Sequence, residues 1–354
     1  MREVKNILYF GIYSPSYARN LVIIRGLKEN GFNVLECNVS AKDRLWPVKL
    51  FLKFLKQIGK FDLMFVPFPG QEVMFLARLL VWRKPIIFDA FTSHYGGYIL
   101  DRKYFPEKSF RAYVYRFLDK WSCRLADLVL LDTNAHIKFF VDEFDLPAEK
   151  FRRLWIGFDE DVFVPRVETH NEPVFRVLFF GTYIPVQGVK YIIESANLLR
   201  IEPIHFVLVG KGQDKDKAVE KVKALNLENV EFKPMLSPHQ LADEIAKSDV
   251  CLGLFGDTPK TLLAIPNKVY ESLAMKKAVI TADTPAVREL FDDGDMVLVK
   301  RADGQAIAEG VRKLMKDPEL KEKIANNGHN KVMKYATNKI IGETLKGYIF
   351  QLQK

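Results

Sequence analysis

The segment IPNKVYESLAM, residues 265–275, carries a lysine and a glutamate that could bind one anionic ligand together. Pro266 fits the first turn of a helix, because its missing N–H would have no partner there. Lys268 and Glu271 are three residues apart, so they share a face at the N-terminal end of that helix. A cation beside free N–H groups can hold a diphosphate, and the deeper carboxylate can accept hydrogen bonds from the vicinal hydroxyls of a sugar. The alternative is an exposed ion pair worth under about 1 kcal/mol.

Two further turns offer groups for the same ligand. FFGTYIPVQGVKYIIESANLL is a predicted strand, turn and helix, in which Gly181 and Gly188 let the backbone approach a ligand. GDTPKT adds Asp257 and Lys260 on the loop that leaves a neighbouring strand. VLVGKGQ lacks the GxGxxG spacing and a suitably placed acidic residue, which argues against an NAD site.

The elements that position these residues are strands and helices in alternation. Short continuous apolar runs separated by helical stretches indicate parallel sheets covered on both faces. The pattern restarts near residue 175, after the polar stretch FVPRVETHNEPVF. We therefore predict an α/β fold of two doubly wound Rossmann-like domains, residues 1–165 and 166–330, with a ligand cleft between them. A final helical segment over 331–354 is long enough to cross back onto the first domain.

Composition restricts the class of protein. The 354 residues carry a net charge of +9, of which +6 lies in residues 1–165. A basic first half suggests an anionic partner there, although no nucleic-acid-binding motif is present and we expect no nucleic acid. The three cysteines are widely spaced, which is typical of reduced thiols in a cytoplasmic protein. We find no signal peptide and no spanning segment, and expect a cytoplasmic protein that is soluble or peripheral on the inner face of the membrane.

One predicted helix, WPVKLFLKFLKQIGK, aligns four lysines in a stripe among apolar residues. They are Lys49, Lys53, Lys56 and Lys60. The pattern suits a surface helix with solvated lysines. It also suits a basic amphipathic helix lying on anionic lipid, where each lysine contributes about 1 kcal/mol.

Four segments, in this order and spacing, resemble the nucleotide-sugar half of the family 4 glycosyltransferases. They are FFGTYIPVQGVKYIIESANLL, VLVGKGQ, IPNKVYESLAMKKAVIT and DTPAVRELF. The resemblance covers about residues 175–330 and is fainter in the first half, where ADLVLLDT and WIGFDEDVFVP match the approach to the interdomain linker. It implies retaining enzymes of the GT-B fold, with the nucleotide sugar on the second domain and the acceptor on the first.

The resemblance also assigns roles to the second-domain residues. Glu271 matches the second glutamate of the Glu-x7-Glu motif, which takes the nucleotide ribose. Lys268, with Asn267 beside it, lies near the diphosphate. The backbone from Lys233 to Met235 would face the base.

The sequence departs from that pattern at two places. Leu263 stands where the family has the first glutamate, and Thr182 and Gln187 stand where it has the arginine and lysine that neutralise the diphosphate. We hypothesise that Lys260 and Lys268 replace those charges. Arg19, in GIYSPSYARN, would assist from across the cleft.

In the first half, PIIFDAFTSHYGGY ends a strand with Asp89 and continues to His94. The resemblance implies a histidine after this strand that contacts the donor sugar. His94 is the nearest match and Asp89 the alternative, while either residue could be purely structural. Gly11 ends the first strand, where the backbone would approach donor and acceptor. The Asp-x-Asp pairs fall in polar turns, and the histidines lack ligand spacing, so we expect no required metal.

The sequence thus predicts a metal-independent retaining glycosyltransferase of the hexosyltransferase type. Its donor would be a nucleoside-diphosphate sugar such as a UDP- or GDP-sugar, and its acceptor a hydroxyl on a glycan, a lipid-linked precursor or a polysaccharide precursor. Two alternatives stay open: a non-catalytic glycosyltransferase-like partner subunit, which would bind partners without turning over donor, and a nucleotide-sugar epimerase, which would turn over donor with no acceptor.

Overall fold

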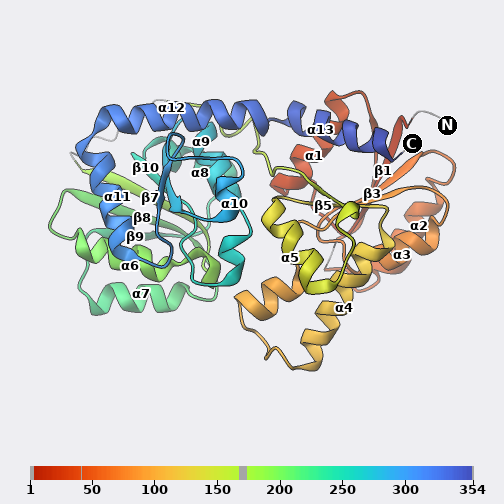
Figure 1. The fold of residues 1–354 in the computed structure, drawn as a ribbon, viewed down its shortest axis with the longest axis horizontal. Coiled ribbons are helices and arrows are strands. Elements are labelled where there is room, and N and C mark those ends of the chain that lie inside the picture. The colour runs from red at the N-terminus through yellow and green to blue at the C-terminus, as the bar shows by residue number, and fades with distance from the viewer. Residues whose placement is uncertain (1–3, 41, 167–173, 353–354) are drawn as a thin grey trace. The chain divides into compact units, whose positions relative to one another are not determined.

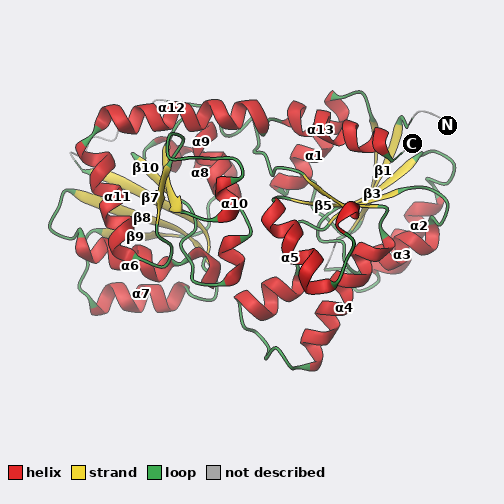
Figure 2. Cartoon of the chain, viewed as in Figure 1, coloured by secondary structure: helices red, strands yellow, loops and turns green. Residues whose placement is uncertain are grey.

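The computed structural model describes residues 4–40, 42–166 and 174–352, and they form two units (Figure 1). Unit 1 comprises Met1–Gly157 and Tyr335–Lys354, and unit 2 comprises Phe158–Lys334. Each unit is a parallel sheet with helices on both faces, as Figure 2 shows. The chain leaves unit 1 once and returns to it at its C-terminal end.

The sheet of unit 1 has the strand order β2-β1-β3-β4-β5-β6, with every pairing parallel. Its strands are β1 (Asn6–Gly11), β2 (Asn33–Asn38), β3 (Leu63–Val66), β4 (Ile86–Asp89), β5 (Leu128–Leu131) and β6 (Phe151–Arg153). The three central strands β3, β4 and β5 are buried at every residue, which explains their continuous apolar sequences.

Two helices cover one face of this sheet and four cover the other. The first pair is α1 (Ala18–Glu29) and α13 (Asn338–Gln351). The second group is α2 (Trp46–Leu55), α3 (Val73–Leu80), α4 (Phe110–Leu125) and α5 (Asn134–Phe144), with the π-helical turn η1 (Tyr95–Asp101) and the short helix η2 (Ala148–Lys150). Helices α1 and α13 touch through glycines, since a Cβ on Gly342 would lie 2.0 Å from the carbonyl oxygen of Gly26.

The sheet of unit 2 repeats the pattern with the order β12-β11-β10-β7-β8-β9, again parallel. Its strands are β7 (Phe175–Thr182), β8 (Ile204–Lys211), β9 (Val230–Lys233), β10 (Val250–Leu252), β11 (Ala278–Ala282) and β12 (Val297–Val299). Its helices are η3 (Pro185–Gln187), α6 (Val189–Leu198), α7 (Lys215–Ala224), α8 (Pro238–Ala246), η4 (Pro259–Leu262), α9 (Asn267–Ala274), α10 (Pro285–Arg288), α11 (Gly304–Lys316) and α12 (Pro318–Tyr335).

The predicted fold class is confirmed, because both sheets of the described residues are parallel and lie among helices in alternation with their strands. The sequence placed the domain boundary at residue 165, whereas unit 1 ends at Gly157. The stretch after Gly157 is not a solvated linker, because Phe158, Val162 and Phe163 are buried and Arg166 pairs with Asp243 of α8. Residues 167–173 of the polar stretch lie outside the described residues.

Helix α2 is shorter than the lysine pattern suggests. It ends at Leu55, so Lys56 is its C-cap and Lys60 lies beyond it. Among the described helices, none has the length and apolar content that a membrane crossing requires.

Candidate functional site

The strand order of unit 2 reverses between β7 and β10, and ligands of open parallel sheets bind at such a reversal, outside the carboxyl ends of the strands. The turn after β7 runs from Gly181 to Gly188 and leads into α6. The chain after β10 begins at Gly253 and leads through η4 to α9. The predicted donor residues therefore come from the loops that flank the switch point.

Lys268 joins these two loops. Its Nζ donates to Oε1 of Gln187 at 2.5 Å and to the carbonyl oxygen of Gly253 at 3.3 Å, and it lies 3.8 Å from the ring centroid of Phe179. The side chain is buried, and desolvation lowers the pKa of its ammonium well below the usual range, against the attraction of Glu271. An ammonium held here with few neutralising groups is suited to an anionic ligand.

Gly181 leaves the space above this ammonium open. A Cβ at position 181 would lie 3.4 Å from Nζ of Lys268, and the glycine has a φ of +146°. Any larger side chain would therefore cover Nζ from the turn side and strain the backbone. Gly188 is needed for a different reason, since its φ is +68° and a Cβ there would lie 2.5 Å from the backbone carbon of Phe255.

Glu271 lies one helical turn after Lys268 and is also buried. Burial raises the pKa of its carboxyl to about 7, Lys268 opposes the shift, and Asp159 adds to it. Helix α9 begins at Asn267, with Pro266 as its N-cap in an extended conformation, so the proline precedes the first turn instead of lying in it. Asn267 is half-buried at this helix end.

The other predicted donor residues lie around this centre. Thr182 is exposed at the end of β7, Lys260 is half-buried in η4, and Leu263 caps η4 where the family pattern has a glutamate. Met235 is exposed two residues after β9. These residues lie in the loops where they were expected, and their contacts with a donor remain predictions.

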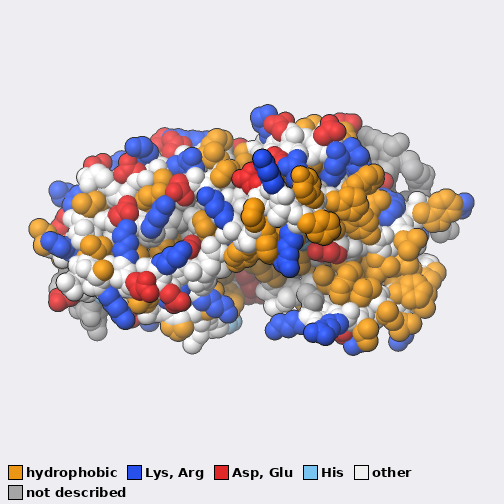
Figure 3. All heavy atoms as spheres, turned by 90° about the horizontal axis from the view of Figure 1, so that it is seen from below, with side chains coloured by type: hydrophobic (Ala, Val, Ile, Leu, Met, Phe, Trp, Pro, Cys, Tyr) orange, Lys and Arg blue, Asp and Glu red, His pale blue; other side chains and the backbone are white. Residues whose placement is uncertain are grey.

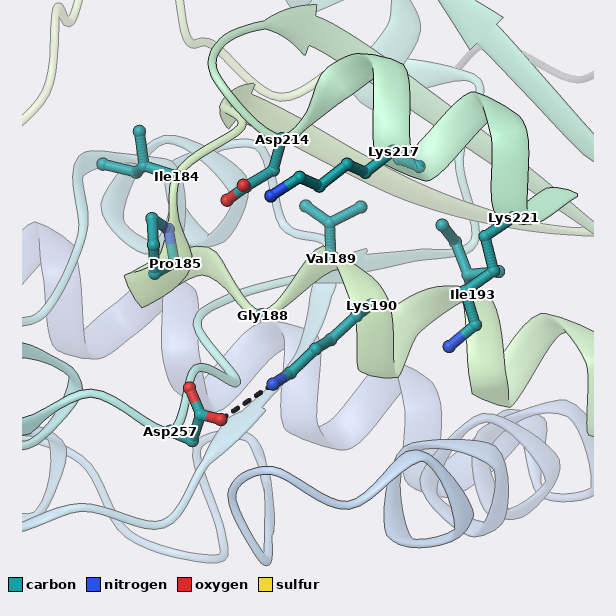
Figure 4. Close-up of a pocket in the computed structure, with 11 residues that line it drawn as sticks. Ile184, Pro185, Gly188, Val189, Lys190, Ile193, Asp214, Lys217, Lys221 and Asp257 are labelled. Carbon is teal, nitrogen blue, oxygen red and sulfur yellow. Dashed lines mark hydrogen bonds and ion pairs between the residues drawn. The ribbon is translucent and has the colours of Figure 1, made fainter. Parts of the chain in front are cut away.

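Asp257 and Gly188 line a separate cavity of about 280 Å³ between the start of α6 and α7, shown in Figure 4. Asp257 accepts from Nζ of Lys190 at 2.8 Å and from the hydroxyl of Tyr191 at 3.0 Å. Lys221, which lines the same cavity, pairs with Glu194 at 2.8 Å. Two of its lysines are thus neutralised, and its lining does not include Lys268, Gln187 or Glu271.

In unit 1 two of the predicted residues pair with each other. Arg19 and Asp89 are completely buried and form a two-pronged ion pair, with Nε to Oδ2 at 2.7 Å and Nη2 to Oδ1 at 2.6 Å. Arg19 also donates to the carbonyl oxygen of Leu154 at 3.3 Å. Each side chain is therefore the other's partner inside unit 1, and their roles toward the donor stay predictions. Gly11 is buried at the end of β1, with Pro67 at ordinary contact distance.

His94 directly precedes η1 and is held by its backbone. Its N–H donates to Asp119 of α4 at 3.0 Å, and the same carboxylate accepts from the hydroxyl of Ser93 at 2.6 Å and from the N–H of Tyr95 at 2.9 Å. The residue is 9% exposed, and its Nδ1 has no hydrogen-bond partner in the described structure. Oε1 of Glu72 lies 3.8 Å from this nitrogen, beyond hydrogen-bond distance. A buried ring nitrogen without a hydrogen bond is a group that a ligand hydroxyl could satisfy.

Sequence reasoning missed the anchoring role of Asp119 and the buried pair of Asp132 and His136, whose Oδ1 and Nδ1 are 2.8 Å apart. Asp119 lies within a helix and carries no local signal. Asp132 directly follows β5, at a strand end where parallel sheets present functional groups, and that placement was the available signal.

Residues 163–331 match the family model described as Glycosyl transferases group 1. This stretch lies within unit 2 and contains the turn after β7, Lys268 and Glu271. Unit 2 is therefore similar to the glycosyl transferases group 1 domain. The match agrees with the resemblance that the motifs of this domain indicate.

Two curated glycosyltransferases are similar in sequence to this chain. The chain is 26% identical over 227 residues to the alpha-D-kanosaminyltransferase of Streptomyces kanamyceticus, an alignment covering 60% of this chain and 57% of that protein. It is 23% identical over 250 residues to the N-acetylgalactosamine-N,N'-diacetylbacillosaminyl-diphospho-undecaprenol 4-alpha-N-acetylgalactosaminyltransferase of Campylobacter jejuni, covering 68% of this chain and 65% of that protein. The chain thus spans less than two thirds of either curated relative.

Solved structures establish the fold around the group 1 domain. The HepE protein of Anabaena in complex with UDP matches with a TM-score of 0.72 and 16% identity, covering 98% of this chain and 100% of that chain. Sucrose-phosphate synthase from Thermosynechococcus elongatus matches with a TM-score of 0.75 and 14% identity, covering 99% of both chains. The fold is therefore GT-B.

Proposed function

We propose that this protein transfers a sugar from a nucleoside-diphosphate sugar to an acceptor hydroxyl. The observation that carries the proposal is the buried ammonium of Lys268, which lies beneath the glycine turn at the switch point of the group 1 domain. A diphosphate docked there would receive a fixed positive charge in a site of low dielectric. Fixed charges of this kind stabilise a departing diphosphate more than mobile charges in water do.

We assign the donor contacts residue by residue. Lys268 and the free N–H groups at the start of α9 hold the diphosphate, with Lys260 adding charge from η4. Glu271 accepts hydrogen bonds from the ribose hydroxyls, and the backbone after β9 faces the base. The turn containing Gly181 approaches the phosphates closely because no side chain intervenes. His94 of unit 1 donates from its imidazole to a hydroxyl of the donor sugar.

The chemistry is a displacement at the anomeric carbon: the acceptor oxygen forms a bond to that carbon, the bond from the carbon to the diphosphate oxygen breaks, and the hydroxyl proton of the acceptor passes to the departing diphosphate. We propose attack on the same face, hence retention, as the resemblance to family 4 implies. We propose that no metal is required, because the ammonium of Lys268 beside the turn after β7 would neutralise the phosphates. The structures of HepE with UDP favour a uridine donor. The Campylobacter relative is named for an acceptor on diphospho-undecaprenol, which favours an acceptor carried on a lipid diphosphate.

We further propose that the protein works in the cytoplasm at the inner face of the membrane. All four lysines of the segment 46–60 are exposed, which supports this placement. Two of them already have partners, since Lys49 pairs with Asp43 at 2.5 Å and Lys53 donates to the carbonyl oxygen of Asn38 at 2.7 Å. The stripe alone is therefore a weaker anchor than four free lysines would be.

A turnover assay tests the transfer reaction. The purified protein is incubated with a panel of UDP- and GDP-sugars, with and without polyprenyl-diphosphate-linked glycans and with and without EDTA, and released nucleotide and sugar products are measured. Glycosyl transfer predicts nucleoside-diphosphate release that depends on acceptor and persists in EDTA. Conversion of the donor sugar without acceptor would instead indicate an epimerase. Donor binding without any turnover would indicate a non-catalytic subunit.

A further inference from the structure

Unit 1 exposes an unusual amount of large apolar surface. Of the 22 exposed large apolar side chains in the described residues, fourteen lie between Leu45 and Trp121, and five lie in unit 2. Single exposed apolar residues are normal, whereas a dense group marks an interaction surface. Figure 3 shows hydrophobic side chains gathered over the right-hand part of the molecule, with Lys and Arg side chains at their border.

Helix α4 contributes a stripe that core packing does not explain. Its buried face consists of small or polar residues, including Ala112, Asp119 and Cys123. The opposite face carries exposed large side chains at helical spacing. They are Phe110, Tyr113, Val114, Phe117 and Trp121. Phe110 is 80% exposed, so its ring contributes little to the core of unit 1.

The stripe on α4 continues onto α3 and α2. The ring of Phe75 on α3 stacks on Phe117 with centroids 6.0 Å apart. The ends of α3 and α2 border one hollow of about 220 Å³, lined by Phe54, Ile58, Phe61, Leu80 and Trp82 among others. Beyond it lie the exposed apolar residues of α2 and its flanks. They are Leu45, Val48, Phe51, Leu52, Leu55 and Ile58. We call the exposed apolar residues of segments 45–58, 79–82 and 104–121 the apolar face.

The charges around the apolar face have one sign. Segment 44–60 contains five basic residues and no acidic one, and segment 102–124 contains seven basic and two acidic residues. One of those two acids, Asp119, is completely buried and bonded to the backbone near His94. Cations also accompany the aromatic rings, since the guanidinium of Arg83 lies 4.5 Å from the Trp82 centroid and that of Arg124 lies 5.2 Å from the Trp121 centroid.

We propose that the apolar face is a membrane-docking surface, which inserts its aromatic and aliphatic side chains among the headgroups of an anionic bilayer. Tryptophan and phenylalanine bordered by lysine and arginine are the composition that such an interface requires, because rings settle at headgroup depth while cations meet lipid phosphates. A water-soluble protein partner would not require the excess of positive charge. In this docking mode apolar side chains insert into the bilayer and the surrounding cations strengthen the binding. The lysine stripe alone would supply only the attraction between charges.

Docking would bring the protein to a lipid-linked acceptor. In this respect the proposal rests on the proposed function. The docking measurement nevertheless contains no nucleotide or acceptor. Failure to dock and failure to transfer are therefore separate results.

Co-sedimentation with vesicles tests the proposal. Wild type is mixed with vesicles of phosphatidylcholine, or of equal parts phosphatidylcholine and phosphatidylglycerol, at low and high salt. We expect binding to the anionic vesicles that high salt weakens without abolishing. The Phe110→Ser/Phe117→Ser variant should lower the partition coefficient at least tenfold. Ile201→Ser, which removes a 91% exposed apolar side chain from unit 2, is the matched control and should bind like wild type.

Tryptophan fluorescence with brominated lipids gives a second readout on the unmutated surface. We expect quenching in wild type, and loss of most of it in Trp82→Phe/Trp121→Phe, which keeps Trp46 and Trp155. Absence of binding to anionic vesicles, or binding of the serine variant equal to wild type, would overturn the proposal. So would a wild-type dimer, without vesicles, that the serine variant converts to monomer, because the face would then join two copies of this chain.

Discussion

Lys268 and Gln187 are 81 residues apart in the sequence, yet the ammonium of one donates to the side-chain oxygen of the other at 2.5 Å. The resemblance to family 4 glycosyltransferases expects a lysine at position 187, and this chain has a neutral glutamine there. Helix α9 thus delivers a cation to the turn from the opposite side. The hypothesis that Lys268 replaces the missing charge has a geometric basis, whereas the guanidinium of Arg19 is already paired with Asp89.

A charge swap tests whether the position of the cation matters or only its presence. Gln187→Lys alone would place two ammonium groups in contact, so we expect a lower free energy of unfolding and weaker donor binding. Lys268→Gln alone should weaken UDP binding at least tenfold, which corresponds to about 1.4 kcal/mol. The double variant Gln187→Lys/Lys268→Gln restores one cation to the same hydrogen bond, and should bind UDP within tenfold of wild type by calorimetry. Additive losses in the double variant would contradict the replacement.

Glu271 predicts a pH dependence of stability. Its pKa in the folded protein is raised to about 7, so the folded state keeps a proton that the unfolded state loses near pH 4.5. The free energy of unfolding should therefore fall as pH rises from about 4.5 to 7, by about 3 kcal/mol from this group. Urea unfolding across this range should show that fall in wild type and lack it in Glu271→Gln.

The exposed Glu309 of α11 supplies the control for that measurement. Glu309→Gln changes the same chemical group at the surface and should keep the wild-type pH profile. Identical profiles for wild type and Glu271→Gln would show that Glu271 is not a buried, proton-holding carboxyl.

The pair of Arg19 and Asp89 is expected to hold the fold together without taking part in the reaction. Removing one partner leaves an uncompensated buried charge, so Arg19→Met or Asp89→Asn should lower the free energy of unfolding by about 3–5 kcal/mol. Because each group is buried and already paired with the other, the folded fraction of each variant should keep its kcat. An Asp89→Asn protein with wild-type stability and no activity would instead restore Asp89 as a catalytic residue.

His94 is expected to act on the ligand and not on stability. His94→Phe keeps a ring against Tyr98 and Tyr115 and removes a buried nitrogen that makes no hydrogen bond in the described structure. The contact of that nitrogen with Glu72 at 3.8 Å is too long for a hydrogen bond, so the melting temperature should not fall. Loss of one hydrogen bond to the donor sugar should lower kcat/KM at least tenfold. His239→Phe, at an exposed position of unit 2, should retain full activity. Equal activity in both variants would remove His94 from the site.

The strands were predictable because parallel sheets bury both faces. Runs such as those of β4 and β5 must then be continuously apolar, and their spacing fixes the alternation with helices. The order of the strands places Lys268 at the switch point once its loop is known. The fold class, and the edge of the unit 2 sheet at which the site lies, can therefore be predicted from the local sequence.

Side-chain contacts across the sheet were not predictable in the same way. Nothing local distinguishes an arginine bound for Asp89, 70 positions away, from one that reaches solvent. Lys268 reaches Gln187 only because β7 and β10 are neighbours and Gly181 leaves room, and both conditions depend on the folded chain. The stripe on α4 did have a visible spacing from Phe110 to Trp121, but the sequence alone does not say which face of a helix is buried.

Nucleotide binding to wild type and Lys268→Met tests the central claim most directly. Calorimetry compares UDP, UMP and uridine in EDTA, with Lys313→Met as the control for loss of an exposed lysine. If Lys268 holds the diphosphate, wild type binds UDP more tightly than UMP, and Lys268→Met loses that preference while its affinity for uridine stays unchanged. An equal preference for UDP in wild type and Lys268→Met would contradict the account.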